Sequence, residues 1–84
     1  MKYKLVYIKW EDAFHQEPCQ WENNKGIKAF IEDTDFIVES VGWIVHEDKR
    51  MITISPMRSL RLNSWSHLQR IPIGTIIKKR GLKI

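Results

Sequence analysis

The residues from Tyr3 to Trp10 alternate between the two faces of an extended segment, and this pattern constrains the fold more than any other feature of the sequence. The side chains of one face are Tyr3, Leu5 and Tyr7, and those of the other are Val6, Ile8 and Trp10. Aromatic and β-branched side chains at a period of two are typical of a β-strand. The chain is therefore predicted to fold around a sheet.

Four later segments show the same type of pattern. Strands are predicted at Phe36–His46, Met51–Ser55, His67–Ile71 and Thr75–Lys79. The polar residues 47–50 form a turn between the first two, which predicts a hairpin with Ile52 and Ile54 pointing inward. Gly42 inside a strand indicates a bulge or a sharp bend. Residues 72–74 form a turn that stops the fourth strand.

The remaining segments are predicted as connections. Glu11–Gly26 contains a proline, paired asparagines and scattered apolar residues, which predicts a long loop. Gly26–Asp33 is predicted to form one short helical turn. A helix of eight residues is only marginally stable without tertiary support. Pro56–Ser66 is mixed polar and basic, and it is predicted as a second loop.

The length of 84 residues, with 43% apolar content, allows one hydrophobic core, so residues 1–84 are predicted to form a single domain. Five short strands, a long first loop, a tight central hairpin and a break before the last strand occur in this order in SH3-like small barrels. The predicted fold is therefore mostly β, a five-stranded SH3-like small barrel with one short helical turn. An Sm-like or OB-like barrel would give a similar pattern.

Three short segments, Trp10–Asp12, Ser40–Trp43 and Arg70–Pro72, together resemble a loose group of short, mostly uncharacterised proteins from bacteriophages and bacterial genomes. The resemblance spans most of the chain in order, although each segment is only three or four residues long. It implies a phage or mobile-element setting and a non-enzymatic accessory role. If the protein is phage-encoded, the implied location is the host cytoplasm.

The single cysteine, Cys19, excludes an intrachain disulfide and a zinc site made of several thiolates, which fits a reducing compartment. The apolar stretch near the N-terminus is too short for a signal peptide or a membrane span. The sequence therefore predicts a cytoplasmic protein that does not enter a membrane. No cofactor is predicted.

Catalytic and metal-binding motifs are weak in this sequence. Glu11, Asp12 and His15 lie within five residues, with Cys19 and His46 as further candidate ligands, but the spacing matches no helical pair or known loop pattern. No nucleophile elbow, oxyanion turn or glycine-rich phosphate loop surrounds a Cys–His pair. We expect neither a metal site nor a catalytic residue, and hence no enzyme.

Charge is distributed unevenly along the chain. Residues 1–48 contain five Lys and ten Asp or Glu, a net charge of −5, whereas residues 49–84 contain nine Lys or Arg and no acid, a net charge of +9. Such asymmetry is a signature of proteins that bind nucleic acids or other anions. The alternative is that the two halves neutralise each other, within one subunit or between subunits.

The candidate anion-binding residues lie in this basic half, where guanidinium groups can hold phosphates and an indole can stack on a base. They are Arg58, Arg61, Trp65, His67, Arg70, Lys78, Lys79 and Arg80. The competing interpretation makes Trp65 a core or interface residue and the charges an ordinary solvated face. For Trp43, which has Val41, Ile44 and Val45 as neighbours, core packing is the favoured role.

Two functions follow from these features. The first is a non-enzymatic accessory protein, homo-oligomeric, that holds nucleic acid or a nucleotide signal on its basic face or at subunit junctions. The second is a protein–protein interaction module that inhibits or adapts a host or virion protein through Trp21, Trp65 and the edge strands. Trp21, in a polar loop, is otherwise expected to cover the core as a lid.

Overall fold

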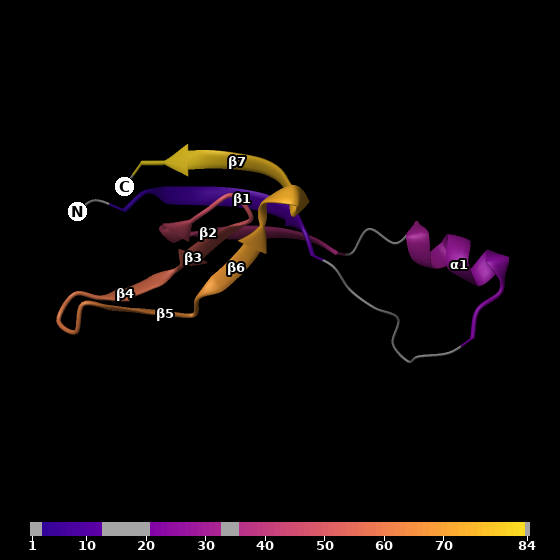
Figure 1. Ribbon diagram of the computed structural model, residues 1–84, viewed down its shortest axis with the longest axis horizontal. Helices are drawn as coiled ribbons and strands as arrows, with labels where there is room; N and C mark the ends of the chain where they lie inside the picture. The colour runs from indigo at the N-terminus through magenta and orange to yellow at the C-terminus, as the bar shows by residue number, and fades with distance from the viewer. Residues whose placement is uncertain (1–2, 13–20, 33–35, 84) are drawn as a thin grey trace.

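The computed structural model describes residues 3–12, 21–32 and 36–83, and its main element is a five-stranded antiparallel sheet (Figure 1). The strands of this sheet are β1 (Leu5–Glu11), β2 (Ile37–Glu47), β3 (Met51–Ser55), β6 (Gln69–Pro72) and β7 (Ile76–Leu82). They lie in the order β6-β3-β2-β1-β7. Each corresponds to a strand predicted from the sequence, so the mostly β fold and its five-stranded sheet are confirmed.

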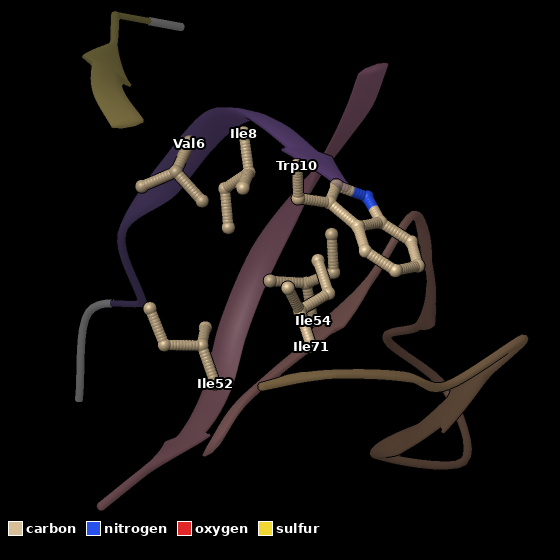
Figure 2. Close-up of a cluster of buried hydrophobic side chains, with 6 residues drawn as sticks. All are labelled: Val6, Ile8, Trp10, Ile52, Ile54 and Ile71. Atoms are coloured by element: carbon tan, nitrogen blue, oxygen red, sulfur yellow. The ribbon is translucent and has the colours of Figure 1, made fainter. Parts of the chain in front are cut away.

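One face of the sheet carries the hydrophobic core. Its buried side chains come from β1, β3 and β6 and lie between these strands in Figure 2: Val6, Ile8, Trp10, Ile52, Ile54 and Ile71. The partly buried residues that pack against them are Val38, Ile44 and Ile76. The alternation predicted for β1 and the inward direction of Ile52 and Ile54 are therefore confirmed. We call the opposite side, which bears Leu5, Tyr7 and Lys9 of β1, the outer face.

The long strand β2 joins the two halves of the sheet. Residues 37–43 pair with β1, and residues 43–47 pair with β3. A register shift between Ile44 and His46 leaves Val45 as an extra residue on this strand. Such a bulge increases twist and bends a strand, which lets one strand serve two partners. The predicted irregularity in β2 is present, and the bulge lies three residues after Gly42.

Gly42 has a different role in β2, because the backbone of β3 passes close to it. A Cβ atom on Gly42 would lie 2.9 Å from the carbonyl oxygen of Ser55 and 3.3 Å from Cβ of Ile54. Both distances are shorter than ordinary van der Waals contacts, and the nearest atom belongs to the backbone. A side chain at this position would push β2 and β3 apart.

We predict that Gly42→Ala lowers the free energy of unfolding by about 1–3 kcal/mol, the usual cost of an overpacked site. Gly81→Ala is the matched control, because Gly42 and Gly81 flank Val6 in the β1 pairing register and a Cβ on Gly81 meets nothing within 4 Å. Chemical denaturation of both variants measures the difference. Equal stability of the two variants would contradict the close approach at Gly42.

The turn that joins β2 and β3 is stabilised by the side chain of Asp48. Its carboxylate oxygen Oδ1 accepts hydrogen bonds from the backbone N–H groups of Arg50 and Met51, at 2.8 and 2.9 Å. These two bonds are the main reason why the pKa of Asp48 lies below its usual value. The Asp48 backbone N–H also donates to the Met51 carbonyl at 3.0 Å, so the predicted polar turn is confirmed.

The turn predicted before the last strand is a single turn of 3-10 helix, η1 (Ile73–Thr75). Thr75 Oγ1 donates to the Pro72 carbonyl at 2.7 Å, and the Ile73 N–H donates to the Arg50 carbonyl at 2.9 Å. The turn carries the chain from β6 at one edge of the sheet to β7 at the other.

The sheet is not closed into a barrel, which departs from the small barrel expected from the sequence. Strands β6 and β7 are the two ends of the strand order. The physical reason lies in β7, where Lys79 and Gly81 stand opposite the inward-facing Ile8 and Val6. Closing this strand onto β6 would bury the Lys79 ammonium group, and removing a charge from water costs several kcal/mol.

The segment predicted as a second loop, residues 56–66, forms a separate two-stranded hairpin of β4 (Met57–Ser59) and β5 (Ser64–Ser66). The fully buried Ser55 fixes its base, since the Ser55 hydroxyl lies 2.8 Å from the Met57 carbonyl and 2.5 Å from the Ser66 carbonyl. Asn63 adopts a left-handed conformation, with φ of 48°, at the end of the turn. Asparagine tolerates this conformation better than most residues.

The one α-helix of the described residues, α1 (Asn24–Ile31), lies away from the sheet at one end of the molecule (Figure 1). Its first turn is capped by Asn23, whose Oδ1 accepts from the Gly26 N–H at 2.9 Å. This cap starts the helix two residues before the helical turn predicted at Gly26–Asp33. None of its residues is buried. No helix in the described ranges has the length and apolar content to cross a membrane.

Candidate functional site

An aromatic cluster forms where the β4–β5 hairpin meets the start of β1. Trp65 packs edge-on against Tyr3, with ring centroids 4.9 Å apart, and lies 6.0 Å from the ring of Trp43. Trp43 stands opposite Leu5 in the pairing register and therefore belongs to the outer face. All three rings are partly buried. The predicted core packing of Trp43 is therefore wrong, because this ring lies on the outer face and packs against Trp65.

Arg58 covers this aromatic cluster and is held in place by it. Its guanidinium carbon lies 5.3 Å from the ring centroid of Tyr3 and 5.1 Å from that of Trp65. Its Nη2 atom also donates to Oδ1 of Asn63 at 3.1 Å. A guanidinium stacked on rings keeps N–H edges that can reach solvent, which prepares it to bind an anion bidentately. Arg58 remains an exposed residue.

A second arginine occupies a similar position further along β1. The guanidinium carbon of Arg80, on β7, lies 5.5 Å from the ring centroid of Tyr7. The Tyr7 hydroxyl donates to Oε2 of Glu39 at 2.8 Å, and this hydrogen bond raises the pKa of Tyr7. Glu39 thereby fixes the ring on which Arg80 rests. Tyr3 and Tyr7 are four residues apart, which is about 13 Å along an extended strand.

Two lysines complete the basic part of the outer face. Lys9 on β1 and Lys78 on β7 are direct partners in the antiparallel register. This pair lies two residues along the strands from the pair of Tyr7 and Arg80, and therefore on the same face of the sheet. Glu39 stands opposite Lys9 on the other side. Within the described ranges neither lysine forms an ion pair. Like charges directly opposite each other in a sheet are destabilising, so the approach of the two ammonium groups is unfavourable, and Glu39 opposite Lys9 offsets part of this repulsion.

We call the set formed by Tyr7, Lys9, Lys78 and Arg80 the basic outer face. Of the residues predicted from the sequence it includes Lys78 and Arg80, while Arg58 and Trp65 belong to the adjoining aromatic cluster. Trp65 is not an open platform for stacking, because Arg58, Tyr3 and Trp43 occupy its surroundings.

The other predicted anion-binding residues lie elsewhere. Arg61 is in the turn of the β4–β5 hairpin, and Arg70 is on β6, at the edge of the sheet opposite to β7. His67 has a left-handed backbone, with φ of 59°, and its Nδ1 lies 2.9 Å from the Ser66 hydroxyl. Lys79 points to the core side, where its ammonium group lies 3.6 Å from a carboxylate oxygen of Glu47.

This Lys79–Glu47 contact also bears on the uneven charge of the chain. Among the described residues it is the one ion pair that joins the acidic half to the basic half; the others, Lys28–Glu32 and His46–Asp48, lie within the first half. Mutual neutralisation of the halves inside one subunit is therefore slight in this part of the chain. Most of the basic charge of β4–β7 faces solvent.

A metal site does not form in the part of the chain that the structure describes. No three His, Cys, Asp or Glu side chains come together there in a way that could hold an ion. Among the candidate ligands, His46 contacts Asp48 at 3.3 Å. His15 and Cys19 lie outside the described residues.

Trp21, predicted as a lid over the core or a partner-binding residue, is fully exposed just before α1. It does not cover the core, because a side chain packed over the core would have lost exposed surface. The lid interpretation is therefore wrong for this structure. A fully exposed indole is uncommon on a soluble domain, and it is available to a partner.

The chain is without a match in every comparison. No protein-family model matches it, and neither a curated protein nor a solved structure does so. The resemblance to phage proteins through Trp10–Asp12, Ser40–Trp43 and Arg70–Pro72 stays a prediction.

Lys9 and the two tyrosines are members of the site region that the sequence analysis did not select. The sequence did carry a signal for Lys9, because the alternation that places Tyr3, Leu5 and Tyr7 on one face continues to residue 9. The proximity of Lys78 to Lys9 could not be predicted from local sequence, because it depends on the pairing of β1 with the last strand.

Proposed function

We propose that this protein is a non-enzymatic binding protein that holds a phosphate-bearing ligand, a nucleic acid strand or a nucleotide, on its basic outer face. The observation that carries the proposal is the direct opposition of Lys9 and Lys78 on a solvent-exposed side of the sheet. A bound phosphate placed between two ammonium groups would replace their repulsion by two favourable contacts.

The neighbouring arginines support the same ligand class. Arg80 and Arg58 rest on tyrosine rings, so each guanidinium loses little freedom when it binds a phosphate. Exposed sheet faces that combine cations with aromatic rings suit single strands and free nucleotides better than a rigid duplex. Glu39 opposes anion binding on this face, but its hydrogen bond from Tyr7 fixes the platform below Arg80.

The setting and the assembly state belong to the same proposal. We propose a phage-type accessory role in the host cytoplasm, with the protein acting as a homo-oligomer. Both a nucleotide signal and a nucleic acid strand would be present there. The same cationic and aromatic side chains would bind the phosphate groups of either ligand. Catalysis has no part in the proposal.

A second candidate, binding of a host or virion protein, is favoured by the complete exposure of Trp21. Large aromatic residues that become buried are frequent centres of protein–protein interfaces. The edge strands β6 and β7 add free backbone groups to which another chain can pair.

Native mass spectrometry of the protein, purified gently from its host, tests these proposals together. Retention of a small mass that contains phosphate, or of a short nucleic acid, supports the first function. A tightly bound protein that is lost from the Trp21→Ala variant, with no phosphate-bearing mass retained, supports the second and contradicts the first.

A further inference from the structure

Two arginine–tyrosine contacts lie at different points along the outer face. Arg58 rests on Tyr3, just before β1 begins, and Arg80 rests on Tyr7, four residues later. The two rings are about 13 Å apart along an extended strand. The first contact lies at the end of the sheet where the β4–β5 hairpin meets the start of β1 (Figure 1). The arginines are therefore spread along the direction of β1 and do not gather at one point.

Apolar side chains occupy the outer face between these two contacts. Leu5 lies midway between the two tyrosines in the alternation of β1, and its register partners are Trp43 on β2 and Leu82 on β7. All three are partly buried. Val41, the register partner of Tyr7 on β2, is 50% exposed. This uncharged strip suits the flat faces of nucleobases and not their phosphates.

The spacing of the arginines distinguishes between the two ligands of the proposed function. The phosphates of a free nucleotide are joined directly to one another, so they reach one group of cations. In a nucleic acid strand the phosphates are separated, with one for each nucleotide. At about 3.4 Å per stacked nucleotide, about 13 Å corresponds to roughly four nucleotides. A single OB-type domain binds about 4–16 nucleotides of a single strand, so this length is typical of such sites.

We infer that the ligand is a single nucleic acid strand that runs along β1, with phosphates on the basic outer face at one end and on Arg58 at the other. This inference rests on the proposed function and narrows its ligand class. The bases between these phosphates lie over the uncharged strip. Near Lys9 the strand follows the β7 side, where Lys78 and Arg80 stand, because Glu39 occupies the β2 side.

Arg58 is the residue that separates the two ligand classes. Its guanidinium group is held by the rings of Tyr3 and Trp65 and by Oδ1 of Asn63, yet the residue stays exposed. It is therefore positioned in advance for a phosphate. A nucleotide bound between Lys9 and Lys78 does not extend to it, whereas a strand of several nucleotides does.

Isothermal titration calorimetry with three ligands tests this inference: thymidine triphosphate and 5′-phosphorylated oligothymidylates of two and of eight nucleotides. The wild type is expected to bind the octamer more tightly than the dinucleotide. Arg58→Gln is expected to weaken binding of the octamer roughly 10-fold, because one charge-assisted contact is lost. The same variant is expected to bind the dinucleotide and the triphosphate as the wild type does.

Arg61→Gln is the matched control, since Arg61 lies in the turn of the same hairpin and its loss changes the net charge equally. Both arginines are exposed, so both variants are expected to keep the melting temperature of the wild type. Equal weakening of octamer binding by the two variants would overturn the inference. Equal weakening of octamer and dinucleotide binding by Arg58→Gln would overturn it as well.

Failure of the proposed function gives a different result. If none of the three ligands bound, or if Lys9→Gln/Lys78→Gln bound them as the wild type does, the proposed function would be wrong and this inference with it. If Lys9→Gln/Lys78→Gln weakened the binding of all three ligands while Arg58→Gln left octamer binding unchanged, only the extended strand along β1 would be wrong.

Discussion

Ile8→Ala is expected to lower the free energy of unfolding by about 2–5 kcal/mol, a large fraction of the stability of a domain of this size. Ile8 has no exposed surface and lies among the six buried side chains of the core (Figure 2). Its neighbours in the register are Ser40 on β2 and Lys79 on β7, and neither can fill the space left by the lost atoms. The cavity would therefore persist.

Ile77→Ala is the matched control for this prediction. Ile77 is 55% exposed and lies on β7 at the register shift opposite Lys9 and Trp10. The same change of side chain is expected there to alter stability by less than about 0.5 kcal/mol. Urea denaturation of both variants provides the comparison. If the two losses were equal, the core would not be where the structure places it.

The second large effect is expected on ligand binding. We predict that Lys9→Gln/Lys78→Gln weakens binding of a labelled single-stranded oligothymidylate roughly 10- to 100-fold at low salt, because two charge-assisted contacts are lost. The slope of log K against log salt concentration is expected to become shallower by about 0.7, the contribution of one phosphate contact with a single strand, because the two lysines hold the same phosphate. Fluorescence anisotropy over a salt series measures both quantities.

Lys25→Gln/Lys28→Gln controls for net charge, because both lysines lie on α1, away from the sheet. This variant carries the same overall charge as Lys9→Gln/Lys78→Gln and is expected to bind nearly as the wild type does. Equal weakening by the two variants would mean that the oligonucleotide responds to total charge and not to the basic outer face.

The parts of the fold with strong local patterns were predictable. The alternation of residues 3–10 gave β1 its core face, and the polar residues 47–50 gave the β2–β3 turn in which Asp48 accepts two backbone bonds. The β4–β5 hairpin was missed because each of its strands has only three residues, too few to display a period. Asn63 was the available signal, as a residue suited to the left-handed turn position.

The open sheet and the candidate site were harder to predict for one common reason. Both depend on which residue of β1 faces which residue of β7, and the two strands are separated by most of the chain. Local propensity carries no information on such a register. For example, the sequence grouped Lys78, Lys79 and Arg80 as one cluster, whereas alternation in β7 sends Lys79 to the core side and into contact with Glu47.

The assignment of Trp65 depended on context in the same way. Its sequence neighbours fitted a stacking platform and a packed residue equally well. The approach of Tyr3 and Trp43, both distant in sequence, makes it a packed residue that positions Arg58. In the proposed anion site, Arg58 and not the indole ring of Trp65 is therefore the residue that would contact the ligand.

The most direct test of the proposed function is an NMR titration of the ¹⁵N-labelled protein with a single-stranded oligothymidylate and, separately, with a nucleoside triphosphate. We predict saturable shifts of the backbone amides of Tyr7, Lys9, Lys78 and Arg80 with at least one of the two ligands, and smaller shifts near Arg58. Shifts confined to Trp21 and α1, or the absence of any saturable shift on β1 and β7, would contradict an anion-binding site on the outer face.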